Sequence, residues 1–236
     1  RPAQAAVAEA PMPTAAPEAS PRPEARRMAL QTPSRARAIA GGPEVLLQAA
    51  FRAPQATGPA TSRKGTVCGD PAIKGKTIPP ILGKVKGCGL DEAVSVTSVA
   101  GVALSQPASI DCATARSLKD WVEGGVKPAV GRRGGGVAAL QVAASYSCRP
   151  RNNQKGAKIS EHGRGRAVDI SAILLADGTA VTVARGWGSK GFGKTLASMR
   201  KAACGPFNTV LGPGSDPFHG DHFHLDTAHG RGPYCR

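Results

Sequence analysis

After about residue 90, apolar and polar positions follow regular periods along the chain. Alternation with a period of two predicts strands, and apolar stripes with a period of about 3.6 predict helices. Locally paired strands with interspersed helices then predict an α+β fold, in which helices flank a small antiparallel sheet. The expected strands are 93–102, 136–147, 167–175, 179–184, 207–211 and 222–225, and the expected helices are 114–124 and 194–203.

The predicted strand 167–175 separates polar chemistry from the core. Its even positions, including Val168 and Ile170, are apolar and should face the interior. Asp169 lies between them and should therefore point to the opposite face. The turn Asp177-Gly178 would join this strand to the next one as a β-hairpin.

Residues 1–64 have a different composition and no core-forming pattern. This segment holds half of the 20 prolines, many alanines, no Cys and no His. Because frequent prolines remove backbone donors and little here could form a core, we expect a disordered Ala/Pro/Arg-rich tether. Within it, residues 44–52 have the pattern of a short amphipathic helix. The folded domain then spans 65–236, and the tether is either a passive linker or a spacer.

The charge balance bears on the partners. With 31 Lys and Arg against 16 Asp and Glu, the formal charge is +15, which favours association with polyanions. Basic residues are scattered, aromatic residues make up 4%, and no nucleic-acid-binding motif is present, so we expect anionic envelope polymers rather than nucleic acid. No apolar run approaches the roughly 18–20 residues of a membrane span, so we predict no transmembrane segment.

The cysteines indicate an oxidising compartment. Six are present, all after residue 60, and no two are spaced as Cys-x-x-Cys. This pattern argues against a thiolate zinc site and favours three structural disulfides in a periplasmic or secreted protein. We predict that neighbours in the sequence pair: Cys68 with Cys88, Cys112 with Cys148, and Cys204 with Cys235.

Two separated blocks carry the candidate chemistry. The block SEHGRGRAVD places His162 seven positions before Asp169, and the block DHFHLD places His222 and His224 at alternate positions. A strand directs residues i and i+2 to the same face, so both imidazoles of the second block would enter one cleft. His162, Asp169 and one of that pair would give Zn²⁺ three ligands and leave a fourth position for water, as in catalytic zinc sites.

These blocks resemble the signature of the zinc peptidases grouped with lysostaphin and the D-Ala-D-Ala peptidases, a fold that the hedgehog signalling domain shares. With the proline-rich start and the six cysteines, the segment from about 65 to 236 resembles the bacterial extensin-like C-terminal domain family. The resemblance implies a zinc site in a groove on an antiparallel sheet, with His162, Asp169 and His224 as ligands. The residues that carry it are Ser160, His162, Gly165, Ala167 and Asp169, followed by His222 and His224.

The resemblance also implies roles for neighbouring residues. His222 would lie beside the zinc and exchange protons. Arg149, in a Ser-x-Arg-Pro element, would stabilise the oxyanion of the reaction or, alternatively, pair with Glu161 or Asp169. D-Ala-D-Ala dipeptidases carry a glutamate base three residues before the last ligand, where this chain has Asp221. Aspartate is shorter by one methylene, so we favour His222 over Asp221 as the proton-handling group.

The function expected from this resemblance is a zinc-dependent peptidase of the cell envelope. It would hydrolyse peptidoglycan stem or cross-link peptides as a D,D- or L,D-endopeptidase or carboxypeptidase. The nucleophile would be hydroxide, because zinc lowers the pKa of its bound water toward about 7. Ser160 would contact substrate or cap a turn, and Trp187 would line a substrate groove or fill a core. The alternative is a non-catalytic zinc-containing protein that binds the cell wall.

Four further polar residues complete the candidate chemistry. Asp226 would either orient a ligand imidazole or lie at the surface. Glu161, His219 and His229 are expected to be exposed.

Overall fold

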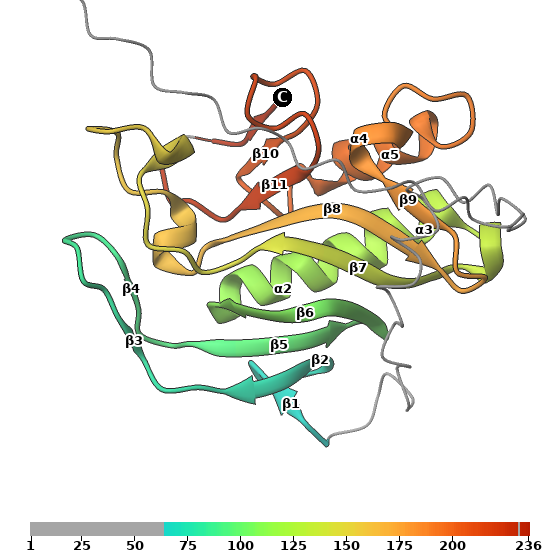
Figure 1. Ribbon diagram of the computed structural model, residues 1–236. Helices are drawn as coiled ribbons and strands as arrows, with labels where there is room; N and C mark the ends of the chain where they lie inside the picture. The colour runs from blue at the N-terminus through green and yellow to red at the C-terminus, as the bar shows by residue number, and fades with distance from the viewer. Residues whose placement is uncertain (1–63, 231) are drawn as a thin grey trace, which may run out of the picture. The chain divides into compact units, whose positions relative to one another are not determined.

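The computed structural model describes residues 64–230 and 232–236 (Figure 1). The predicted tether, with its helix at 44–52, therefore lies outside the described residues except for Lys64. The described strands are β1 (Thr66–Val67), β2 (Asp70–Thr77), β3 (Ile81–Leu82), β4 (Gly89–Leu90), β5 (Val94–Val99), β6 (Val102–Ile110), β7 (Val137–Ala144), β8 (Ala167–Leu175), β9 (Ala180–Thr182), β10 (Thr209–Leu211), β11 (Phe223–Asp226) and β12 (Tyr234–Cys235).

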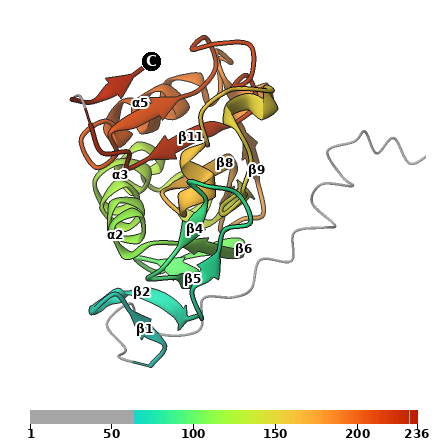
Figure 2. The same cartoon turned by 90° about the vertical axis from the view of Figure 1, so that its left-hand side faces the viewer.

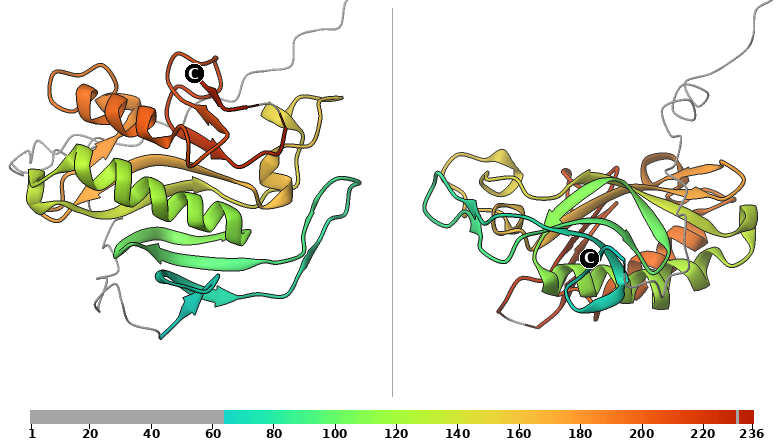
Figure 3. Two further views of the ribbon diagram at one scale, coloured as in Figure 1. Left: turned by 180° about the vertical axis from the view of Figure 1, so that it is seen from behind. Right: turned by 90° about the horizontal axis from the view of Figure 1, so that it is seen from below.

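In this part of the chain, ten strands form one sheet in the order β1-β2-β5-β6-β7-β8-β11-β10-β12, with β9 paired to β8. Strands β3 and β4 form a separate two-stranded sheet. Helices α2 and α5 lie on one face of the large sheet (Figures 2 and 3). The helical segments are α2 (Cys112–Trp121), η1 (Val122–Val126), α3 (Lys127–Val130), η2 (Arg133–Gly135), η3 (Arg151–Asn153), η4 (Glu161–Arg164), α4 (Val183–Gly186) and α5 (Gly193–Ala203).

The predicted fold class, a small antiparallel sheet flanked by helices, is wrong. The sheet is large and mixed, because β6 pairs with β7 and β10 with β12 in parallel. The chain passes from β6 to β7 through α2, since parallel neighbours need a crossover and a helix is the usual one. Two long strands were not predicted because their alternation is broken: β2 contains Pro71 and Gly75, and β6 contains Pro107. The two-residue strands β1, β3, β4 and β12 were not predicted either.

Within the described residues, all strands and helices predicted from periodicity are present, with ends shifted by a few residues. The helix expected to end at 124 differs more, because helical structure continues beyond that residue. Asp111 caps α2 by accepting a hydrogen bond from the backbone N–H of Thr114, but the helical path continues through η1 and α3 to Gly131. Gly125 in η1 allows α5 to pack closely, since a Cβ at this position would lie 2.8 Å from the Cβ of Ala202 at the end of α5.

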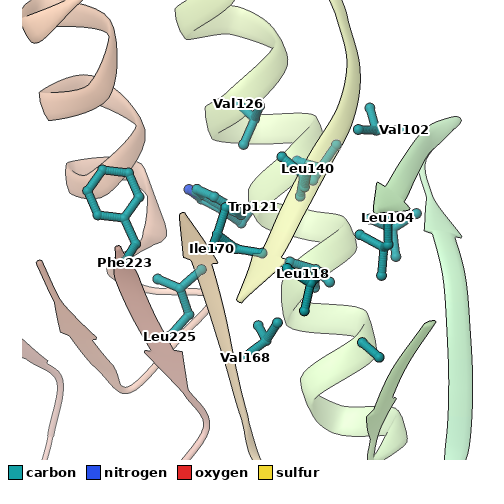
Figure 4. Packing of buried hydrophobic residues seen from close by; sticks show 14 of the residues in the cluster. Val102, Leu104, Leu118, Trp121, Val126, Leu140, Val168, Ile170, Phe223 and Leu225 are labelled. Carbon is teal, nitrogen blue, oxygen red and sulfur yellow. The ribbon is translucent and has the colours of Figure 1, made fainter. Parts of the chain in front are cut away.

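The main hydrophobic core lies between these helices and the sheet. Trp121 of α2 is fully buried, and its indole N–H donates to the carbonyl oxygen of Met199 in α5 at 2.7 Å. Figure 4 shows Leu118 and Trp121 facing Ile170 of β8 and Leu225 of β11. No helix in the described part of the chain is both long and apolar enough to cross a membrane.

All six cysteines form disulfides, but two of the three predicted pairings are wrong. Cys204–Cys235 is present as predicted and joins the end of α5 to β12. The other two bonds link segments that are distant in the sequence, because β2 packs against α2 and β4 packs against η4. These bonds are Cys68–Cys112 and Cys88–Cys148.

Candidate metal centre

The pairing of β8 with β11 brings two of the predicted ligands together. The strands are antiparallel, and the Cα atom of His224 lies opposite that of Asp169. Val168 and Leu225, their neighbours along the two strands, are fully buried in the hydrophobic core. Because side chains alternate along a strand, Asp169 and His224 project together from the opposite face.

His162 reaches the same place from η4, the short turn that precedes β8. Gly165 ends this turn with a φ of 67°, in the left-handed region that favours glycine. A Cβ at this position would also lie 2.5 Å from the side chain of Leu90. The glycine therefore allows the sharp change of direction between His162 and the strand that carries Asp169.

The three side chains form a compact buried group. Nε2 of His162 lies 3.1 Å from the carboxylate of Asp169 and 3.1 Å from Nδ1 of His224, which is 2.9 Å from Asp169 Oδ1. One ligand atom of each residue lies within 4.8 Å of the others, and all three residues are buried. Two imidazoles and a carboxylate are donors that zinc accepts. The group can therefore bind a metal ion.

The second nitrogen of each imidazole is already engaged. Nδ1 of His162 donates to the carbonyl oxygen of Ser145 at 2.7 Å, and Nε2 of His224 donates to the carboxylate of Asp226 at 3.0 Å. Such hydrogen bonds fix the ring orientation and leave the other nitrogen for a metal. Asp226 is itself buried and accepts a hydrogen bond from the backbone N–H of Ala228. Of the two interpretations of Asp226, the structure supports the orienting one.

Hydrogen bonds outweigh burial in setting the charges of this group. Burial lowers the pKa of His224, but the carboxylates of Asp169 and Asp226 raise it to about 9. Burial likewise raises the pKa of Asp169, but hydrogen bonds with His162 and His224 hold that pKa far below its ordinary value. Without metal, the His224 ring therefore keeps both of its protons at neutral pH and is positively charged. A metal ion must displace one of these protons to bind.

The donor group lies in a groove with a volume of about 520 Å³. His222 lines this groove with its Nε2 at 3.8 Å from Asp169, while its Nδ1 donates to the carboxylate of Asp221 at 2.8 Å. The side chain of Asp221 is 75% exposed and, among the described residues, does not belong to the groove lining. Of the two predicted proton-handling groups, His222 faces the donor group and Asp221 orients it.

A further imidazole in the groove was not expected. His219, predicted to be exposed, is only 7% exposed, and its Nδ1 donates to the carboxylate of Asp216 at 2.7 Å. Its ring centre lies 5.2 Å from that of His222. Burial lowers the pKa of His219 although Asp216 opposes the shift, which favours the neutral ring. The spacing Asp216-x-x-His219 was the only sequence signal for this pair.

Arg149 lines the groove as an unpaired cation. Among the described residues, none forms a hydrogen bond or ion pair with its guanidinium. Of its two alternative partners, Glu161 instead accepts a hydrogen bond from Arg164 at 2.9 Å. The other, Asp169, contacts His162 and His224. Glu161 was expected to be exposed, but it is 4% exposed, and its Oε2 is buried without a hydrogen-bond partner within the described structure. The charge of Arg149 is therefore available to a bound ligand.

The structure separates the two predicted substrate-binding residues. Ser160 is buried, lines the groove and precedes η4, where its side chain makes no capping hydrogen bond. Trp187 packs edge-on against Phe223 with ring centres 6.0 Å apart, and the guanidinium of Arg200 lies over its indole. Within the described residues, Trp187 is not part of the groove lining. His229 is exposed, as predicted.

These features define a class of protein: a disulfide-bonded domain whose mixed sheet carries a buried His-Asp-His group, able to bind a metal ion, in an open groove. Residues 72–236 match the family model described as the C-terminus of extensin-like proteins. The chain belongs to this family. Comparisons with curated proteins and with solved structures found no match.

Proposed function

We propose that the protein is a zinc-dependent peptidase of the cell envelope that hydrolyses peptidoglycan stem or cross-link peptides. The supporting observation is the buried group of His162, Asp169 and His224, whose imidazoles are oriented from behind and which opens into a groove. Zinc held by these residues would act as a Lewis acid and activate water for attack on a peptide carbonyl.

The remaining residues of the groove have the chemistry that peptide hydrolysis needs. With Nδ1 donating to Asp221, His222 presents Nε2 as an acceptor that takes a proton and returns it to the leaving amine. The unpaired guanidinium of Arg149 stabilises the developing oxyanion, an effect for which one donor typically contributes about 100–1,000-fold in rate. His219, oriented by Asp216, offers a second imidazole for a hydrogen bond to the substrate.

The setting supports an envelope protein. Three disulfides are consistent with a secreted or extracellular protein, since such bonds persist in oxidising compartments. The formal charge of +15 suits an anionic envelope. We therefore assign the peptide substrate to peptidoglycan rather than to a cytoplasmic protein.

Digestion of purified sacculi tests the proposal. We expect the zinc-loaded protein to release muropeptide fragments, identified by mass spectrometry, and a chelator to stop the release. His222→Gln should retain stoichiometric zinc but lose most turnover, whereas His229→Ala, which removes an exposed imidazole, should match the unchanged protein. The identity of the fragments shows which bond is cleaved.

One outcome would replace the proposal with the alternative function. If the zinc-loaded protein sediments with sacculi but releases no fragment with or without chelator, it is a metal-containing wall-binding module. Equal fragment release by the unchanged protein and by Asp169→Ala would exclude this group as the catalytic site.

A further inference from the structure

The tip of the β3–β4 hairpin exposes apolar side chains that serve neither the core nor the groove. Residues 82–87 are all exposed, and within them Leu82 is 85% and Val85 54% exposed. Among the described residues, the other large apolar side chains exposed to this degree are Phe218 and Tyr234, and both line the groove. Leu82 and Val85 therefore require a different explanation.

The same tip is strongly basic. Lys84 and Lys86 alternate with the apolar positions, and no acidic residue occurs between 71 and 90. We call residues 82–87 the hairpin tip. Segments that bind the interface of an anionic bilayer combine exposed aliphatic side chains with lysines in the same way. Their aliphatic side chains enter the acyl boundary, and their lysines reach the lipid headgroups.

A second basic segment lies at the same end of the sheet. Residues 149–160 also contain no acidic side chain, and Arg151, Lys155 and Lys158 are exposed within them. Figures 1 and 3 show this segment and the hairpin projecting from the same end of the domain. The surface available to an anionic partner therefore extends beyond the hairpin tip.

Covalent and polar contacts hold the hairpin in this position. The Cys88–Cys148 disulfide joins the residue directly after the hairpin tip to the residue directly before the second basic segment. Arg164 also donates to the carbonyl oxygen of Gly87 at 3.3 Å. An anchored tip loses less conformational freedom on binding than a free loop, which favours association with a surface.

We propose that the hairpin tip binds the surface of an anionic lipid bilayer, with Leu82 and Val85 inserted at the interface and Lys84 and Lys86 at the headgroups. A soluble polyanion would engage the lysines but leave both aliphatic side chains in water, so these side chains favour lipid over polymer. Arg149 and Arg151 of the second basic segment line the groove, so this wall of the groove lies at the same end of the domain as the hairpin tip. The proposal is independent of any metal.

Vesicle sedimentation with the full chain tests this inference. Binding is measured on vesicles of phosphatidylcholine alone and with one third phosphatidylglycerol, with chelator present. We expect binding only to the anionic vesicles, weakened about tenfold by Leu82→Ser/Val85→Ser and by Lys84→Gln/Lys86→Gln. Lys194→Gln/Lys201→Gln removes the same charge from exposed positions of α5 and should change the affinity less than twofold. Every variant keeps residues 1–63, so their contribution cancels.

Two results would overturn the proposal. If Leu82→Ser/Val85→Ser binds anionic vesicles within twofold of the unchanged protein, the apolar side chains do not enter the bilayer. If the α5 control loses as much affinity as Lys84→Gln/Lys86→Gln, the association follows net charge and the hairpin tip is not a site. Circular dichroism of each variant establishes that the fold is retained.

Discussion

The two faces of the β8–β11 pair share one backbone and differ in nearly all their chemistry. On one face Val168, Ile170 and Leu225 are fully buried in the main core, and on the other Asp169 and His224 belong to the group that can bind a metal ion. A single antiparallel register sets both faces, and a slip of one residue would exchange them. Burial of the apolar face therefore holds the donors of the polar face in position before any metal arrives.

The largest expected effect comes from breaking the polar face alone. His162→Ala removes one of three donors, so we expect loss of stoichiometric zinc after dialysis, measured by elemental analysis, and loss of turnover. His229→Ala removes an exposed imidazole and should retain both. Stoichiometric zinc in the His162→Ala protein would show that the buried group is not the metal site.

A substitution on the apolar face should lower stability but leave zinc binding intact. Leu225→Ala leaves a cavity in the core, so we expect the free energy of unfolding to fall by about 2–5 kcal/mol in denaturant titrations. Below its melting temperature the variant should still bind one zinc ion, because the backbone pairing of His224 with Asp169 does not need this side chain. A folded Leu225→Ala protein without zinc would show that the faces are not separable.

Much of the β8–β11 pair was predictable from the sequence, because the alternation of apolar and polar residues along a strand is a local pattern. Alternation placed Asp169 on the face opposite Val168 and Ile170, and that prediction is confirmed by burial on one side and the donor group on the other. The mixed sheet was not predictable in the same way. Parallel pairing of β6 with β7 depends on contacts across a helix, and Pro107 hid the strand itself.

The same limit applies to cysteines and to the groove. Pairing of sequence neighbours is confirmed for Cys204–Cys235 and wrong for the others, because tertiary packing, which sequence distance does not report, decides which segments meet. His219 and Glu161 looked like exposed polar residues because their burial depends on segments packed over them. The burial of Asp226 depends on packing in the same way, so the sequence is compatible with both of its interpretations.

The charge of the polar face predicts a pH dependence that the apolar face lacks. In metal-free protein the pKa of His224 is about 9, above its ordinary value of 6.5. The folded state therefore binds an extra proton between these values, and the associated stability is complete below pH 6.5 and lost as pH rises through 9. We expect the free energy of unfolding to fall by on the order of 3 kcal/mol over this window with chelator present.

Zinc should remove that decline, because the ion takes the place of the proton on His224. Denaturant titrations at pH 6.5, 8 and 9.5, with chelator and with zinc, measure the difference. The same decline in both series would assign it to other groups, and His229→Ala should show the pattern of the unchanged protein.

The smallest expected effect concerns the layer behind the donors. Asp226→Asn keeps the shape of the side chain but removes the charge that orients His224, so we expect zinc affinity to fall about 10–100-fold in competition with a chromophoric chelator. Asp216→Asn is the matched control, because Asp216 also holds an imidazole of the groove, but one outside the metal-binding group. Its zinc affinity should stay within about threefold of the unchanged protein. Equal losses in the two variants would mean that the general negative charge of the groove, rather than the orientation of His224, sets the affinity.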